Sequence, residues 1–244
     1  MNSKNLSNVL ISLIIGISLT LSSYFIAQGL INFRSESKII RVTGSAKKQI
    51  RSDLVKWSGI YTVEAKTLKE AYKLLSESQK KVKDYFINKG LSEKDIIFSS
   101  ISTTVIYEIL PNGVTTTRVE GYRLSQKIEI TSKEIDKITE LSRKSTELIN
   151  VGVQFESLPP QYFYTKLADL KIEMLSLATE DAVRRAEQIA KSTGTKVERL
   201  RSAYMGVFQI TPLYSTEVSD YGINDTTSID KEITAVVNCE FLIR

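Results

Sequence analysis

Residues 5–33 carry no charged side chain, and residues 9–31 are almost continuously apolar or small. As an α-helix, the 23 residues of this run would extend roughly 34 Å, enough to cross a hydrocarbon core of about 30 Å. Its serine and threonine hydroxyls are compatible with a membrane, because each can bond to a carbonyl one turn earlier. The run therefore predicts a tail and a transmembrane signal-anchor within residues 1–33, in contact with membrane lipid through residues 9–31.

A cleaved secretory signal is the alternative interpretation of the same run. Residues 27–29 (AQG) offer a small-x-small cleavage site, but the apolar stretch is longer than the about 7–15 residues typical of a signal. This favours a retained anchor. Charge counting leaves the orientation open: the basic residues after the span outnumber Lys4, yet the positive-inside rule weakens when a long folded domain follows.

The rest of the chain is only mildly basic. Of 33 lysines and arginines only Lys4 precedes residue 34, which leaves 32 basic against 28 acidic side chains. The basic clusters at 47–48, 80–83 and 184–185 are short and lack interleaved aromatic residues, so we expect no nucleic-acid partner. They are interpreted as solvated surface, with contact to anionic lipid as the alternative.

Histidine and cysteine usage excludes several kinds of site. The chain has no histidine and a single cysteine, Cys239, so an internal disulfide, the usual zinc sites and histidine-dependent triads are not available. Cys239 shares one strand face with Ile233, Ala235, Val237 and Phe241, which predicts a buried and inert thiol. We predict no catalytic, cofactor-binding or metal-binding residue and no cofactor.

Hydrophobic periodicity predicts an α+β fold in which antiparallel sheets pack with about three helices, in the order βαββαβ-αββ. Strands are expected at 39–46, 53–65, 96–109, from Tyr122 through Ile130, and at 151–155, 196–210 and 231–243. The first helix follows a capping box at 67–70 and stops at Gly90, the second follows residues 131–134, and the third covers 166–192. Their predicted buried stripes are Leu68, Ala71, Leu75, Val82 and Phe86; Ile135, Ile138, Leu141, Leu148 and Ile149; and Leu167, Leu170, Met174, Leu177, Ala178, Ala182, Ala186, Ile189 and Ala190.

The stretch 211–230 is a candidate for function because it has no apolar period and is long for a loop in a compact domain. It contains Glu217, Asp220, Asp225 and Asp230 and no basic residue. Calcium binding is one interpretation, but the spacing lacks the regular ligand pattern of a known loop. The other interpretations of this stretch are a disordered hairpin tip and a contact with a partner or a second copy. Residues 224–226 also match a glycosylation sequon.

Several short segments, in order along the chain, resemble the SIMPL-domain family. They are 42–46 (VTGSA), Asp53 before a strand, Ala71, 121–123 (GYR), 151–155 (VGVQF) and 182–190 (AVRRAEQIA) followed by Gly194. The resemblance covers about residues 39–243, after a short linker at 34–38. One departure is Ser52, because many members have a proline before the aspartate.

The resemblance implies a bacterial envelope protein without an established reaction. Members include periplasmic immunogenic antigens, proteins linked to oxidative-stress defence and at least one large channel-shaped oligomer. We therefore expect a single-pass membrane protein with a cytoplasmic tail and an extracytoplasmic, non-enzymatic domain at 39–244. It is expected to form a homo-oligomer or bind envelope proteins, with a link to envelope or oxidative stress.

The alternative function is a histidine-free envelope hydrolase that uses paired carboxylates. The chain has 28 acidic residues, so an imagined pair is no evidence by itself. Asp53 is the one acid that the family pattern singles out, and a turn or capping role fits its place at a strand entrance better than chemistry does. A deep pocket in which two acids converge, one with a raised pKa, would favour the hydrolase.

Overall fold

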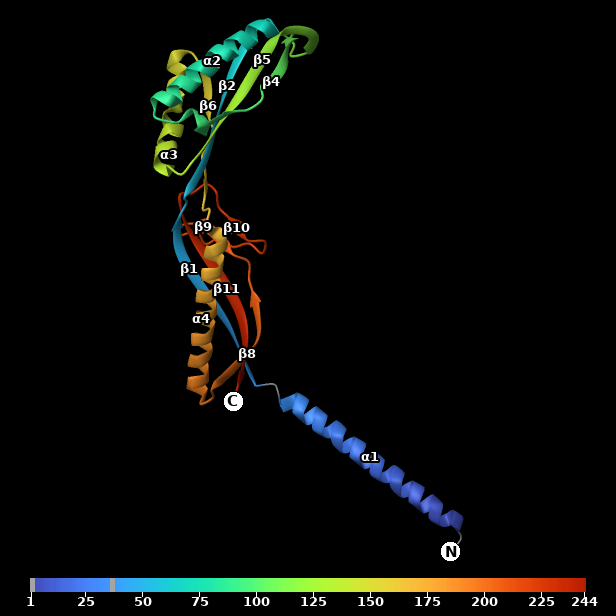
Figure 1. Cartoon of the computed structure of the whole chain (residues 1–244). Helices are drawn as coiled ribbons and strands as arrows, with labels where there is room; N and C mark the ends of the chain where they lie inside the picture. Colours follow the sequence, from blue (N-terminus) through green and yellow to red (C-terminus); the bar gives the residue numbers. More distant parts are fainter. Residues whose placement is uncertain (1–2, 36–37) are drawn as a thin grey trace. The chain divides into compact units, whose positions relative to one another are not determined.

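The computed structural model describes residues 3–35 and 38–244, with side chains described for 13–29 and 38–244 (Figure 1). The chain divides into two compact units. The second unit comprises Lys47–Met174 and Val207–Thr234; the first comprises Leu175–Gly206, Ala235–Arg244 and the chain up to Ala46. Helices and mixed sheets occur together in the described residues, which confirms the predicted α+β class; the expectation of purely antiparallel sheets is wrong, because the strands Gln209–Pro212 and Ile223–Asn224 pair in parallel.

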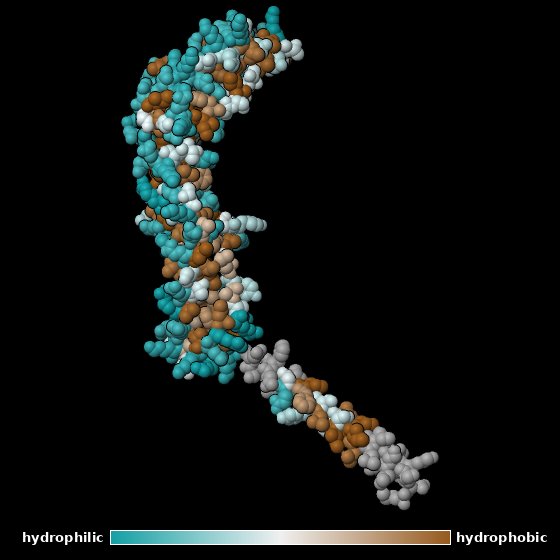
Figure 2. All heavy atoms as spheres, in the orientation of Figure 1, coloured by the Kyte–Doolittle hydropathy of each residue, from teal (hydrophilic) through white to brown (hydrophobic). Residues whose placement is uncertain are grey.

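The uncharged run lies within a single helix, α1 (Ser3–Ser35). The hydroxyls of Ser18, Thr20 and Ser23 bond back to carbonyls three or four residues earlier at 2.8–3.0 Å, as expected. Hydrophobic side chains cover much of the coloured part of α1 in Figure 2. Even so, none of the helices, in the residues described, is long and apolar enough to cross a membrane. The ends of the predicted span, 9–12 and 30–31, lie outside the described side chains.

The second unit is built on a six-stranded sheet with the order β3-β5-β2-β6, in which β4 also pairs with β5 and β7 with β2. Two helices pack against it, α2 (Leu68–Asn88) and α3 (Ile135–Lys144), and Figure 1 shows both on the same face. The strands are β2 (Leu54–Ala65), β3 (Ile96–Phe98), β4 (Ser102–Ile109), β5 (Thr115–Ser132), β6 (Gln154–Ser157) and β7 (Gln161–Phe163).

The core of this unit lies between that face and the helices, and period-2 alternation in β2 and β5 places it there. Trp57 packs against the ring of Phe86 from α2, with 5.4 Å between centroids, and against Phe155 from β6 at 6.3 Å. A Cβ on Gly59 would overlap the Phe155 ring. The absence of a side chain at Gly59 therefore lets Phe155 close the core. The predicted inward face of β5 is confirmed, with Leu124, Gln126, Ile128 and Ile130 buried.

Helix α2 begins where its capping box predicts. The Thr67 hydroxyl accepts a hydrogen bond from the Glu70 amide at 3.3 Å, and Gly90 follows the helix in the left-handed conformation, with φ of 84°. Four of the five residues of the predicted stripe are buried. The prediction for Leu68 is wrong, because this first helical residue projects past the edge of the core and is exposed.

The second predicted helix is shorter than expected. Helix α3 ends at Lys144 and continues as a 3₁₀ helix, η2 (Ser145–Val151), which leaves Ile149 exposed. The predicted cap at 131–134 is also wrong, because β5 continues through Ser132 and the N-cap residue, Glu134, accepts no capping bond. The strand predicted at 151–155 begins instead at Gln154, after Gly152 turns the chain with φ of 80°.

In three other segments the strands begin or end at residues other than those predicted. The strand predicted at 96–109 is interrupted between β3 and β4 and follows a 3₁₀ turn, η1 (Glu93–Asp95). The strand predicted at 196–210 divides at Gly206 into β8 (Val197–Met205) and β9 (Gln209–Pro212). The stretch 211–230 holds a short strand, β10 (Ile223–Asn224), which pairs in parallel with β9.

The other sheet contains β1 (Ile39–Arg51), β11 (Asp230–Ile243) and β8, β9 and β10, in the order β1-β11-β9-β10 with β8 paired to β11. The longest helix of this part, α4 (Leu167–Thr193), begins and ends within one residue of its prediction. Its face of small residues, Ala178, Ala182, Ala186 and Ala190, is buried, whereas Leu177 and Ile189 are exposed, contrary to the prediction. Cys239 and the four residues on its strand face are all buried, as predicted.

In the first unit, α4 lies directly on β1 at Gly44. A Cβ at this position would overlap the carbonyl oxygen of Ala178 and lie 2.7 Å from the Ala182 Cβ. Beside it, the Ser45 amide donates to the Asp181 carboxylate at 3.0 Å. The small residues on both elements thus set the close approach of helix and strand.

We expect Gly44→Ala to lower the free energy of unfolding by about 3 kcal/mol, because the new methyl group meets backbone atoms that cannot move aside. Chemical unfolding of the full chain in detergent, followed by circular dichroism, measures this. Gly113→Ala is the control: unlike Gly44, Gly113 lies in the left-handed region, with φ of 82°, but an added Cβ would have no atom within 4 Å, so this change should cost only about 1 kcal/mol. Equal losses in the two variants would contradict the packing argument.

Candidate functional site

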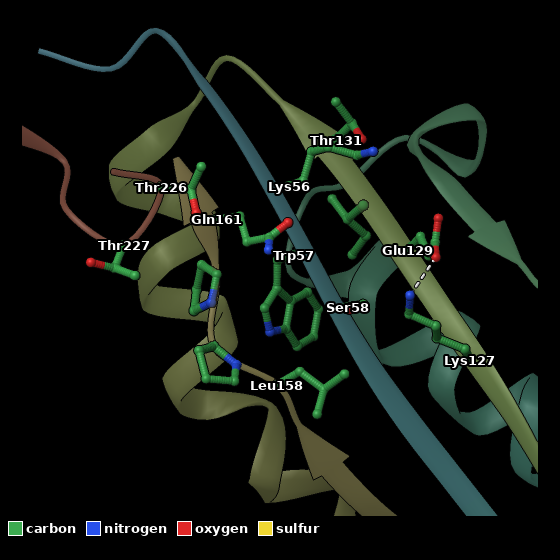
Figure 3. A pocket seen from close by; sticks show the side chains of 13 residues that line it. Lys56, Trp57, Ser58, Lys127, Glu129, Thr131, Leu158, Gln161, Thr226 and Thr227 are labelled. Atoms are coloured by element: carbon green, nitrogen blue, oxygen red, sulfur yellow. Dashed lines mark ion pairs between the residues drawn. The ribbon is translucent and has the colours of Figure 1, made fainter. Parts of the chain in front are cut away.

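A hollow of about 470 Å³, lined by both polar and apolar side chains, lies on the face of β2 and β5 that α2 and α3 leave uncovered (Figure 3). Lys127 and Glu129 form an ion pair of 2.6 Å along its side. Trp57 contributes to its floor but is buried, and its indole nitrogen donates to the Ser157 hydroxyl at 3.1 Å. The other lining residues are Lys56, Ser58, Ile130, Thr131, Leu158, Pro159, Pro160, Gln161, Thr226 and Thr227.

The hollow does not have the groups that carboxylate-pair hydrolysis requires. Glu129 is the one carboxylate that lines it, and the hydrogen bond from Lys127 holds the pKa of Glu129 below its usual range. A general acid needs the opposite shift, because it must hold a proton at neutral pH. Across residues 38–244, every carboxyl group whose pKa is shifted is shifted downward: Glu129, Glu140, Glu147, Asp181, Asp225 and Glu240.

Asp53, the acid that the family pattern singled out, holds a turn. One carboxylate oxygen accepts from the Thr165 amide at 2.7 Å and the other from the Thr165 hydroxyl at 2.8 Å. Thr165 lies two residues before α4 begins. Both carboxylate oxygens of Asp53 are thus bonded to Thr165. This geometry fits the turn or capping role expected from the sequence.

The thiol of Cys239 is placed for packing. It is buried on the inner face of β11 opposite Ala203 of β8, and burial raises its pKa above the ordinary value. A raised pKa keeps the thiol protonated, which makes it a poor nucleophile. Members of each predicted basic cluster form exposed ion pairs: Lys47 with Glu232 at 2.8 Å, Lys83 with Glu93, and Arg185 with Asp181 at 2.7 Å.

The stretch 211–230 is tied down at its far end by a buried lysine. Lys231 has only 2% of its surface exposed, and its ammonium group donates to the carbonyl oxygens of Tyr162, at 2.8 Å, and Asp225. Burial lowers the pKa of Lys231, and the nearby charge of Asp225 acts in the opposite direction. Lys231 was not among the residues predicted to be buried, although its position two residues before Ile233 places it on the buried face of β11 by strand period.

The Asp225 carboxylate orders the same end of the stretch. It accepts from the Thr227 amide at 2.8 Å, the Thr227 hydroxyl at 2.7 Å and the Ser228 amide at 3.2 Å. Partial burial acts to raise the pKa of Asp225, but these bonds and the charge of Lys231 outweigh it and leave the pKa lowered. No cluster of three acidic, histidine or cysteine side chains able to hold a metal ion occurs in the described residues.

The most exposed apolar side chains outside α1 lie in residues 213–222, which we call the display loop. Tyr214, Val218 and Tyr221 have 89%, 82% and 97% of their surface exposed. The backbone is nevertheless ordered: the Gly222 amide and the Gln209 side chain both donate to the Ser219 carbonyl, at 3.1 and 2.7 Å. Tyr214 is left-handed, with φ of 66°, which is rare for a bulky residue.

A second apolar feature lies at the start of α2. Leu68 and Tyr72 from α2 face Ile101 and Thr103 across an open groove of about 600 Å³, with Leu124 at its base and Lys69 beside it. We call it the α2 groove. It is continuous, through Lys69 and Tyr72, with a second hollow that Lys73 and Lys80 also line. The exposed position of Leu68, which the sequence placed in the core, creates one wall of this groove.

Comparison with known proteins identifies the family. A family model described as SIMPL, protein of unknown function (DUF541), matches residues 40–241. The chain belongs to the SIMPL family. Among curated proteins, the search found no match. The resemblance noted from the short segments is confirmed over nearly the whole predicted range, and the family description assigns no reaction to the hollow, the display loop or the α2 groove.

We expect Asp225→Asn to lower the free energy of unfolding at pH 7 by about 1–2 kcal/mol, since a neutral amide accepts more weakly from the three donors. The pKa of Asp225 is lower in the folded state, so its contribution is present above its unfolded pKa of about 3.9 and disappears as the pH falls through the folded value. The difference between variant and wild type should therefore shrink below pH 4.

Chemical unfolding of the full chain at pH 7, 5 and 3 measures this dependence. Asp220→Asn is the matched control, because Asp220 is an exposed acid of the same stretch. A destabilisation by Asp225→Asn that stays constant from pH 7 to pH 3 would argue against the charge as its source.

Proposed function

We propose that this SIMPL protein is a membrane-anchored, extracytoplasmic and non-enzymatic module that assembles with further copies of itself through the display loop. The observation that carries the proposal is the exposure of Tyr214, Val218 and Tyr221 on an ordered backbone. Fully burying one large apolar side chain contributes about 1.5–3 kcal/mol. Because the backbone is already ordered, little conformational entropy is lost when these side chains are buried against a partner.

The anchor is supported by the uncharged run in α1. Large side chains along 13–29, such as Leu19, Phe25 and Ile26, are more than half exposed. A membrane is the environment that satisfies a helix whose apolar residues point in every direction. The family resemblance favours the outer side of the membrane for the domain, with the short tail in the cytoplasm.

A non-enzymatic role is supported by the chemistry of the second unit. The hollow in Figure 3 offers one carboxylate, and that carboxylate is paired with Lys127. Any role in envelope or oxidative-stress defence would then rest on the assembly and its partners, because the thiol of Cys239 is buried and its pKa is raised.

We expect the full chain, expressed in a bacterial host, to stay with membranes after washing with alkaline carbonate. Replacing Leu19 and Phe25 with lysine should release most of it, since each charge at the centre of a span costs about 2.5–3.5 kcal/mol on insertion. Protease added outside spheroplasts should digest the domain of the wild-type chain.

The conservative variant with Leu19→Ile and Phe25→Leu is the matched control and should remain bound. Release of the wild-type chain by carbonate would refute the anchor. Complete protection from external protease, with digestion after lysis, would instead place the domain inside the cell.

Self-association is tested with the full chain in mild detergent, by light scattering that separates the protein mass from that of the micelle. The wild-type chain should form assemblies whose mass rises with protein concentration. Replacing Tyr214, Val218 and Tyr221 with serine should weaken association at least tenfold, because three exposed side chains lose their apolar contact.

The control for this loop variant replaces Leu200, Tyr204 and Met205 with serine. These side chains of β8 are also apolar and exposed, but they belong to the first unit. A wild-type chain that remains a single copy per micelle at every concentration would rule out self-assembly. Equal weakening in the loop and β8 variants would show that the display loop has no special role.

A further inference from the structure

The display loop and the α2 groove are chemically complementary, although both belong to the second unit and no display-loop residue lines the groove. We propose that the display loop of one copy docks in the α2 groove of the next copy. The inference rests on the proposed self-association and adds to it the receiving surface and the symmetry of the assembly.

Charge is the first point of complementarity. Residues 207–230 contain four acids and no basic residue, and Glu217 and Asp220 lie within the display loop itself. Along the α2 groove and its continuation stand Lys69, Lys73 and Lys80, against two glutamates. Within the described part of the chain, no ion pair joins these lysines to a carboxylate. An acidic loop therefore meets lysines whose charge is still available.

Side-chain chemistry is the second point. The groove presents apolar walls from Leu68, Tyr72 and Ile101, all exposed. Its volume of about 600 Å³ is sufficient for aromatic side chains to enter. A tyrosine ring inserted there would pack on apolar walls while its hydroxyl stays at the wet rim, as tyrosine does at interfaces. Lysines at the rim could also lie over the inserted rings.

The neighbouring strand does not oppose such an approach. Residues 99–107, which include the Ile101 wall and most of β4, carry no charged side chain. β4 pairs only with β5 among the described strands, so its other edge is open. Edge strands usually carry charges that discourage contact with other chains. The lack of charge here makes this side of the second unit receptive to a second chain.

The two surfaces differ, so the contact is heterologous: each copy offers a loop to one neighbour and a groove to another. Heterologous contacts propagate, and they close into a ring when the rotation between copies permits. Copies anchored in one membrane all have the same orientation relative to the bilayer. Neighbouring copies can therefore be related by a rotation about the membrane normal. The inferred assembly is therefore a head-to-tail chain or ring of copies in the plane of the membrane.

Charge reversal in the full chain, studied in mild detergent, tests the contact between the display loop and the α2 groove. Glu217→Lys with Asp220→Lys should weaken self-association roughly tenfold, and Lys69→Glu with Lys73→Glu should weaken it by a similar factor, because each places like charges face to face. The chain that carries all four substitutions should recover to within roughly threefold of the wild type. Lys94→Glu with Lys133→Glu, two exposed lysines elsewhere in the second unit, is the matched control and should leave association unchanged.

Mixing two defective chains tests the symmetry. The loop-deficient chain replaces Tyr214, Val218 and Tyr221 with serine, and the groove-deficient chain replaces the exposed Leu68 and Tyr72 with serine. Each alone should be monomeric. Together they should form a 1:1 dimer that grows no further, because one intact loop meets one intact groove and the remaining loop and groove are both defective.

Several outcomes would overturn the inference. It fails if the groove variants associate like the wild type, if the four-fold charge reversal shows no recovery, or if the two defective chains do not combine. In each case self-association of the wild-type chain would still stand, which separates this failure from that of the proposed function. A wild-type chain that never associates would refute both.

Discussion

The rest of the structure depends on one constraint, that each sheet must cover an apolar face. In the second unit α2 and α3 cover the face that carries Trp57, Tyr61 and Leu124, and the rings of Phe86 and Phe155 complete that layer. In the first unit α4 approaches β1 so closely that only Gly44 fits beneath it. These contacts are built from side chains without charge, so they persist across a range of pH and salt.

The helices leave several features of the second unit uncovered. The far face of β2 and β5 carries a hollow lined by one carboxylate, Glu129, which is paired with Lys127. The display loop exposes Tyr214 and Tyr221, while the Gln209 side chain holds its backbone at the Ser219 carbonyl. The far end of the stretch 211–230 is held by Asp225 and the buried Lys231. Leu68 escapes the core at the first turn of α2 and forms a wall of the α2 groove.

Local signals predicted the elements that depend on local chemistry. The capping threonine at the start of α2, the limits of α4 and the buried face around Cys239 follow from side-chain spacing and from one hydroxyl, and all three are confirmed. Predictions failed where the end of a strand depends on its pairing with segments distant in sequence. Ser132 lies within β5 because that strand pairs with β2 as far as Val55, and the break at Gly206 appears where its amide bonds to Val236 instead of continuing β8.

The sequence by itself determined the family, the α+β class, an uncharged N-terminal run and the absence of histidine chemistry, because these depend on residue type and period alone. The sequence also indicated residues 211–230 as a candidate for function. Only the tertiary structure decided that the tyrosines of this stretch face solvent and that Lys231 is buried among carbonyl groups. Exposure and burial depend on which segments distant in sequence come together, and spacing along one segment carries no information about its neighbours.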